Sequence, residues 1–313
     1  MEQRRLKPWH GVVSFVVMMV IFVVIAIPVQ SKLGLIGVGI TELLLLAMAI
    51  GAALIFKQNL KEVFPMKVPK LREVFGVLVF CLGGFMLTIM VSASMAVLAP
   101  EMLEVSQGLT DVITDGSVWF SILVVSIMPA ICEEAMHRGF ILHTFKNVNK
   151  SWVIVLSMAV IFGVFHMDVY RFLPTAILGG CITWVMLKTE NMWMPALYHA
   201  TNNLVPVLLG FAMQGVTQAA MESVDGQSVT AVTTLLESNV AVKVSTIGVY
   251  LMMAVTAFPL LLAGTALMKK KGEKIAGKHV AAIFIAAGVF FFAGLIMVIG
   301  ASVAMVTSQG LMM

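Results

Sequence analysis

Residues 133–138 of the chain read EEAMHR, which places two carboxylates and one arginine inside a long apolar segment. On a helix, Glu134 and Arg138 stand four residues apart and share a face, so the carboxylate can pair with the guanidinium. Glu133 lies about 100° around the helix axis from Glu134 and is free to point elsewhere. The spacing therefore predicts one paired, structural glutamate and one unpaired glutamate whose pKa its surroundings can tune for acid–base chemistry.

Two histidines, His166 and His199, follow in later apolar segments. The midpoint between positions 133 and 166 falls in the polar turn 147–150, so in an antiparallel helix pair Glu133 and His166 lie at one depth, about 25 Å from the turn. We expect this carboxylate and this imidazole to meet. His199 and Asn203 lie four residues apart and share a face of their helix. Because an ionisable group at membrane depth costs roughly 2.5 kcal/mol or more, each such group needs a partner, a water-filled cavity or a function.

Apolar segments must hold these residues in place. The chain has 313 residues, of which 60% are apolar and only 12% are charged, and its mean hydropathy is +1.01. An ordinary soluble domain carries about twice that charged fraction. Segments that can cross a hydrocarbon core of about 30 Å lie at 11–28, 33–56, 74–98, 117–145, 151–167, 172–187, 193–213, 245–268 and 279–305. We predict an all-α fold, a polytopic transmembrane bundle of about eight or nine spanning helices.

The distribution of charge predicts how this bundle is oriented. With the N-terminus in the cytoplasm, 17 of the 20 Lys and Arg residues lie on the cytoplasmic side, and the external segment 99–115 holds four acidic residues and no basic one. The compact architecture favours a bacterial cell membrane, with the lipid bilayer around the protein and no nucleic-acid partner. The chain then divides into four parts. About three N-terminal helices occupy residues 1–116, a core of about four helices occupies 117–213, an external loop occupies 214–242, and about two C-terminal helices occupy 243–313.

The residues at membrane depth resemble the three motifs of the CPBP family of intramembrane proteases, which includes the type II CAAX prenyl endopeptidases and bacteriocin-immunity proteins. The family pattern is Glu-Glu-x-x-x-Arg, then Phe-x-x-x-His, then His-x-x-x-Asn or Asp. In this chain the motifs are Glu133, Glu134 and Arg138, then Phe162 and His166, then His199 and Asn203. The resemblance covers roughly residues 117–210.

For this chain, the resemblance implies peptide-bond hydrolysis inside a helical bundle. Glu133 and His166 would bind and deprotonate the attacking water. His199 and Asn203 would stabilise the oxyanion of the tetrahedral intermediate, for which His199 must present an N–H group. The expected substrate is a membrane-associated peptide or protein.

Three further residues would support this chemistry. Glu134 and Arg138 would hold the helix and orient Glu133, and Phe162 completes the second motif. His137 departs from the pattern, because family members usually have an aromatic or aliphatic residue before the arginine. It adds a titratable group four residues after Glu133, and we expect it to be a local partner of the site or of the interface.

An alternative hypothesis makes the same residues a zinc site, with Glu133, His166 and His199 as ligands. A carboxylate and two imidazoles are a plausible zinc set. However, the sequence contains no H-E-x-x-H motif, and Asn203 is a poor zinc ligand. We therefore favour a glutamate mechanism that needs no metal and no other cofactor.

Two other classes of protein could place such residues at membrane depth. A transporter would use Glu133, Arg138 and His166 as an ion path, but the apolar segments show no paired half-repeats. A membrane immunity or scaffold protein would bind its partner without cutting it, and the presence of every motif residue disfavours this class. Glu42, another carboxylate at depth, is expected near a helix end or protonated within the bundle.

Overall fold

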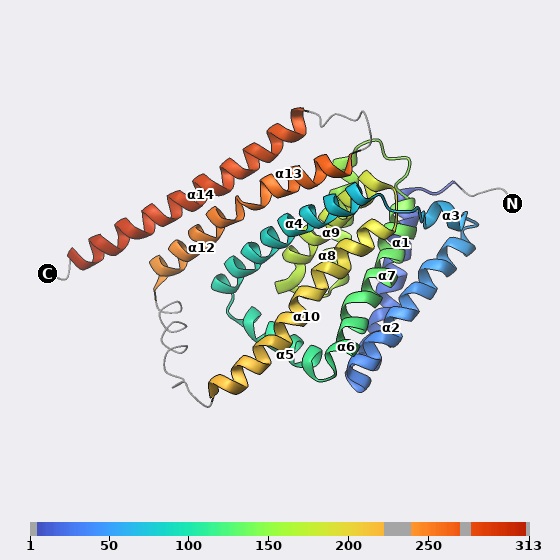
Figure 1. Ribbon diagram of the computed structural model, residues 1–313, viewed down its shortest axis with the longest axis horizontal. Coiled ribbons are helices and arrows are strands. Elements are labelled where there is room, and N and C mark those ends of the chain that lie inside the picture. The colour runs from blue at the N-terminus through green and yellow to red at the C-terminus, as the bar shows by residue number, and fades with distance from the viewer. Residues whose placement is uncertain (1–4, 222–238, 270–276, 311–313) are drawn as a thin grey trace.

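Helices form every regular element in the part of the chain that the structure describes. The computed structural model describes residues 5–221, 239–269 and 277–310. Figure 1 shows these helices packed as a bundle. Within the described ranges, six helices are long and apolar enough to cross a membrane. The protein is therefore an integral membrane protein with an all-α, polytopic helical fold, as predicted.

The first two predicted segments are the arms of one hairpin. The chain reverses at Gly34, whose φ of 53° and ψ of −131° are accessible to glycine. A Cβ atom at Gly37 would lie 2.6 Å from the carbonyl oxygen of Val29, so the two arms touch backbone to backbone beside the turn. The hairpin comprises α1 (Pro8–Ile21), the π-helical η1 (Phe22–Ala26) and α2 (Ile27–Ile55).

The remaining helices follow the order of the predicted segments. A short helix, α3 (Leu60–Val63), precedes α4 (Leu71–Leu98). One continuous helix then consists of α6 (Val118–Ser121), the π-helical η2 (Ile122–Ile127), α7 (Met128–Glu134) and the π-helical η3 (Ala135–Ile141). It is followed by α8 (Ser151–Phe165), α9 (Val169–Thr189), α10 (Trp193–Met221), α12 (Val240–Ala254), α13 (Ala257–Met268) and α14 (Gly277–Gly310).

One expected external loop contains a helix. Segment 99–115 holds α5 (Glu101–Thr114), which packs on α10 and buries Met102 and Ile113. A search for long apolar runs misses this helix, because only one of its faces is apolar. The other expected external loop, 214–242, lies largely outside the described residues.

The continuous helix from α6 to η3 lies between two apolar clusters. Residues of α1, α2, α8 and η3, including Met18, Leu45 and Met158, form the first cluster. Residues of α4, α9 and α10, including Ile182 and Tyr198, form the second. Helices α12 and α13 pack on α4, with α14 beyond them at the edge of the bundle (Figure 1). The site residues are thus held by the helices between α2 and α10.

Helices α8 and α9 approach each other closely at Gly179. A Cβ atom there would lie 2.6 Å from the Cβ atom of Phe162, which is closer than real Cβ contacts allow. At the neighbouring Gly180, a Cβ atom would lie 3.5 Å from that of Ala159, an ordinary contact. The close packing of α9 against Phe162 therefore requires a glycine at position 179, whereas position 180 has room for a Cβ atom.

The variant Gly179→Ala should lower the free energy of unfolding by about 1–3 kcal/mol, because the added methyl group overpacks the α8–α9 contact. Thermal unfolding of the detergent-solubilised protein would measure this as a lower midpoint. The matched control is Gly180→Ala, which should leave the midpoint nearly unchanged. Equal midpoints for the two variants would contradict the packing described for Gly179.

Candidate active site

The two adjacent glutamates lie where α7 passes into the π-helical η3. Glu133 and Glu134 end α7, and Arg138 lies within η3. A π-helical turn is wider than an α-helical turn, and such turns are frequent at functional sites. All three side chains are buried. The local sequence thus directs three charged groups into the bundle from one helix.

A buried ion pair anchors this cluster. The Arg138 guanidinium donates to the Glu134 carboxylate, with 2.8 Å between Nη1 and Oε1. Its Nη2 donates to the Gly179 carbonyl of α9 at 2.8 Å, and its Cζ lies 4.5 Å from the centre of the Phe162 ring of α8. The structure therefore contains the ion pair predicted from the spacing, and that pair also fastens η3 to α8 and α9.

The same carboxylate oxygen of Glu134 holds His199. The distance from His199 Nδ1 to Glu134 Oε1 is 2.7 Å. An ionised carboxylate only accepts hydrogen bonds, so Nδ1 carries the hydrogen. The other ring nitrogen, Nε2, points towards Glu133, with 4.0 Å between Nε2 and Oε2. Glu134 thus orients His199 directly, a link that was not anticipated from the sequence.

Glu133 is the unpaired carboxylate of the site. Its Oε2 atom is buried and has no hydrogen-bond partner among the described residues. Its backbone carbonyl oxygen accepts a hydrogen bond from Nδ1 of His137 at 2.9 Å. The His137 ring packs edge-on against Phe162 and Phe165, so His137 lines the site without pairing with the Glu133 carboxylate.

His166 is close to the other motif residues but is not hydrogen-bonded to Glu133 in this structure. Its Nδ1 lies 2.9 Å from the carbonyl oxygen of Phe162, and both His166 and His199 pack against the Phe162 ring. The prediction that Glu133 and His166 lie at equal depth assumed that two straight helices begin directly at one turn. In fact residues 144–150 are not helical, so Glu133 lies about 15 Å from the end of its helix and His166 about 22 Å from the start of its own.

Asn203 fastens α10 to the π-helical stretch η2. Its Nδ2 donates to the Val125 carbonyl at 3.0 Å, and its Oδ1 accepts from Asn202 Nδ2 at 3.3 Å. Ser126 reinforces the same contact, since its hydroxyl donates to the Ala200 carbonyl at 2.8 Å. Asn203 therefore keeps one amide hydrogen for another acceptor. It lies one turn from His199, as the spacing predicts.

The arrangement of these residues does not fit the zinc hypothesis. The hypothesis needs Glu133, His166 and His199 around one ion. Within the described residues, no three His, Cys, Asp or Glu side chains lie close enough together to hold a metal ion. We therefore derive no chemical step through zinc.

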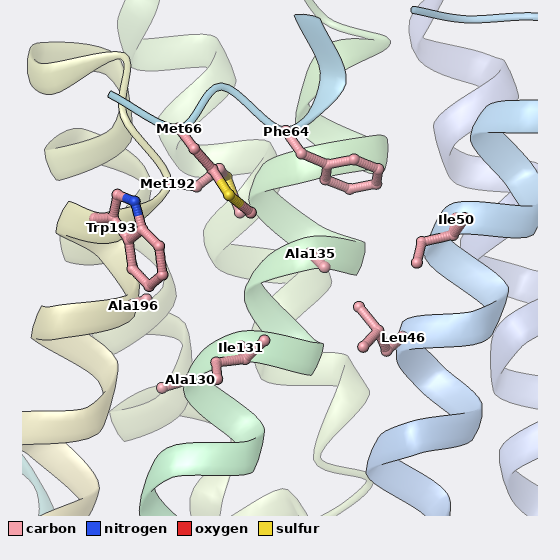
Figure 2. Close-up of a pocket in the computed structure, with 10 residues that line it drawn as sticks. All are labelled: Leu46, Ile50, Phe64, Met66, Ala130, Ile131, Ala135, Met192, Trp193 and Ala196. Atoms are coloured by element: carbon pink, nitrogen blue, oxygen red, sulfur yellow. The ribbon is translucent and has the colours of Figure 1, made fainter. Parts of the chain in front are cut away.

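An apolar pocket of about 180 Å³ lies beside these residues, between α2, α7 and the start of α10. Figure 2 shows its lining, which consists of Leu46, Ile50, Phe64, Met66, Ala130, Ile131, Ala135, Met192, Trp193 and Ala196. Ala130 precedes Glu133 by three residues, and Ala196 precedes His199 by three. The pocket thus begins within one turn of both, and it is smaller than the usual small-molecule site of about 300 Å³ or more. The pocket was not predicted from the sequence, although the small side chains of Ala130, Ala135 and Ala196, which leave room for it, can be found there.

Comparisons with known proteins match the segment of the chain that contains these residues. Residues 115–205 match the family model described as "Type II CAAX prenyl endopeptidase Rce1-like". Over 106 residues the chain is 28% identical to the Bacillus subtilis (strain 168) protein named "Putative membrane peptidase YdiL", a match covering 34% of this chain and 43% of that protein. The chain thus spans less than half the length of this curated relative. No solved structure matches the chain.

The variant Glu134→Gln should lower the free energy of unfolding by about 3–5 kcal/mol, because it leaves the buried Arg138 charge without its counterion. Chemical denaturation of the solubilised protein would measure the loss. The matched control is Glu73→Gln on α4, where the carboxylate pairs with the exposed Lys70 at 3.2 Å, and there the loss should stay below about 1 kcal/mol. Similar losses for both variants would contradict the anchoring role of Glu134.

Proposed function

Because residues 115–205 form a segment of the CPBP type, we propose that this protein is an intramembrane endopeptidase. It would hydrolyse a peptide bond of a membrane-associated peptide or protein. The observation that carries the proposal is the 4.0 Å approach of Glu133 Oε2 to His199 Nε2 among buried residues, since Oε2 has no hydrogen-bond partner in the described part of the chain. These are a base and an oriented imidazole, the groups that peptide hydrolysis needs.

The gap between Glu133 and His199 suits one water molecule. Two hydrogen bonds of about 2.8 Å that meet at a right angle span about 4.0 Å. The water would donate to the Glu133 carboxylate, which takes up its proton as the oxygen attacks the scissile carbonyl. Attack by a neutral water needs such a base, and Glu133 has a free oxygen for this purpose.

Once the water oxygen has bonded to the carbonyl carbon, His199 would donate the same Nε2 hydrogen to the oxyanion that forms and stabilise it. Its Nδ1 hydrogen is already donated to Glu134, so it can donate from Nε2 only as the imidazolium. A donor that is already oriented in a low-dielectric site stabilises developing negative charge effectively. The role implied by the resemblance therefore requires the charged form of His199, with Glu134 as its counterion.

His166 and Asn203 complete the proposed site. His166 contacts the Phe162 ring that also contacts His199, and we assign it to the second side of the water-binding position. Asn203 would offer its remaining amide hydrogen as the second oxyanion donor. The apolar pocket would receive an apolar part of the substrate, as suits a substrate delivered from the lipid bilayer. We keep the N-terminus in the cytoplasm, on the distribution of Lys and Arg.

The variant Glu133→Gln should lower the cleavage rate by about 10²-fold or more, because an amide cannot take up the proton of water. Purified protein in phosphatidylcholine vesicles would be incubated with a library of lipid-anchored peptides, and the products identified by mass spectrometry. Glu73→Gln, which removes a carboxylate remote from the site, should cleave like the unsubstituted protein. Undiminished cleavage by folded Glu133→Gln would refute the proposed mechanism, whereas no cleavage by the unsubstituted protein would favour an immunity or scaffold role.

Purified protein should contain much less than one zinc per chain, and EDTA should leave its cleavage rate unchanged. The reason is that Glu133, His166 and His199 do not converge on one point. Elemental mass spectrometry and the same vesicle assay would measure the two quantities. Stoichiometric zinc together with inhibition by EDTA would establish the zinc-dependent alternative.

A further inference from the structure

Glu42 is a buried carboxyl group that the proposed mechanism leaves unused. Only 5% of the residue is exposed, and its Oε2 atom has no hydrogen-bond partner among the described residues. It lies well inside α2, eight residues after the turn at Gly34 and thirteen before the helix ends. Of the two positions expected for Glu42, the one near a helix end is therefore wrong, and the buried one within the bundle is what the structure shows. A carboxyl group at this depth is costly, so its retention calls for a partner or a function.

Helix α2 directs Glu42 towards α7. A Cβ atom at Gly39 would lie 3.7 Å from side-chain atoms of both Val124 and Met128. One face of α2 carries Gly39, Glu42 and Leu46, which are spaced by three and four residues. Figure 2 shows Leu46 facing the helix of Ile131 across the pocket. Glu42 therefore lies between two levels at which α2 meets that helix.

These contacts place Glu42 about one helical turn from the level of Glu133. Both helices run in the same direction, because Gly39 meets Val124 and Met128, whereas Leu46 lies opposite Ile131.

We propose that Glu42 is a second catalytic carboxyl group, the general acid that gives a proton to the amine leaving from the scissile bond. The proposal rests on the proposed function and adds a residue to it. Glu42 lies outside the matched segment 115–205, so no family motif points to it.

The step balances with two carboxyl groups that hold one proton between them. Glu133 starts ionised and Glu42 starts protonated. When the water oxygen bonds to the carbonyl carbon, Glu133 receives the water proton. When the C–N bond breaks, the nitrogen keeps the bonding electrons and takes the proton of Glu42. The proton on Glu133 then passes to Glu42, which restores the starting state and leaves a carboxylic acid and an amine.

The surroundings of the two groups favour this division of roles. Two carboxylates close together in a low-dielectric site do not both ionise readily, so such a pair tends to hold one proton. Glu133 faces His199, with 4.0 Å between Oε2 and Nε2, and the imidazolium form of His199 makes Glu133 the better site for the negative charge.

The test compares an amide with an ester in the Glu42→Gln variant. A lipid-anchored peptide that the unsubstituted protein cleaves would be prepared with its scissile amide intact and as the matching p-nitrophenyl ester. A p-nitrophenolate leaves without a proton, whereas an amine does not. We expect Glu42→Gln to cleave the amide about 10²-fold more slowly and the ester at the unsubstituted rate. Equal losses on both substrates, or no loss on the amide, would overturn the proposal.

Two further variants keep the outcome interpretable. Glu133→Gln should lose both activities, because water attack is common to the amide and the ester. If it cleaves both normally, the proposed role of Glu133 fails; if the unsubstituted protein cleaves neither, the proposed function itself fails. Glu42→Asp retains a dissociable proton, so its amide-to-ester rate ratio should stay closer to that of the unsubstituted protein. If Glu42→Gln does not fold, Glu42→Leu, which has neither a carboxyl nor a polar group, takes its place. An unaltered amide rate in Glu42→Leu, or an equal loss on both substrates, would overturn the proposal.

Discussion

The buried contact of Arg138, Glu134 and His199 is the interaction on which the rest of the site depends. One carboxylate oxygen accepts from the guanidinium at 2.8 Å and from the imidazole at 2.7 Å, and the guanidinium also reaches the Gly179 carbonyl. Four helices, namely the α7–η3 helix, α8, α9 and α10, therefore meet around one buried charge. Each of these charges would be costly alone in the membrane interior, so the helices are held together by the need to keep the ions paired.

This anchoring explains why two neighbouring glutamates can behave so differently. The Glu134 carboxylate binds the Arg138 guanidinium and the His199 imidazole, whereas Glu133 keeps an oxygen without a partner among the described residues. The ion pair fixes the ring of His199, and the fixed ring defines what Glu133 faces. The proposed structural and chemical roles are thus separated by about 100° of helix rotation. In the proposed reaction, a site assembled in this way needs little reorganisation when charge develops.

The sequence predicted those features that depend on local spacing or on composition. The Glu134–Arg138 pair follows from a separation of four residues, and the all-α membrane fold follows from the apolar segments. The link from His199 to Glu134 spans 65 residues and depends on how α10 packs, which no local pattern encodes. The prediction that Glu133 and His166 lie at one depth stays a prediction, because it rests on a residue count that treats the non-helical residues 144–150 as if they continued the helices. The pocket is likewise a property of packed helices, since it arises where small side chains of α7 and α10 face α2.

In the proposed mechanism, the N-terminal hairpin is part of the site and not merely its support. Helix α2 supplies one wall of the pocket and a buried carboxyl group, although it lies outside the matched segment 115–205. Its position along α7 is set by the reversal at Gly34, because the tight turn fixes which residues of α2 face α7. A shift of one residue would rotate Glu42 by about 100° and turn its carboxyl group away from α7. A helix that only covered the core could tolerate such a shift with other apolar side chains, whereas a helix that contributes to catalysis could not.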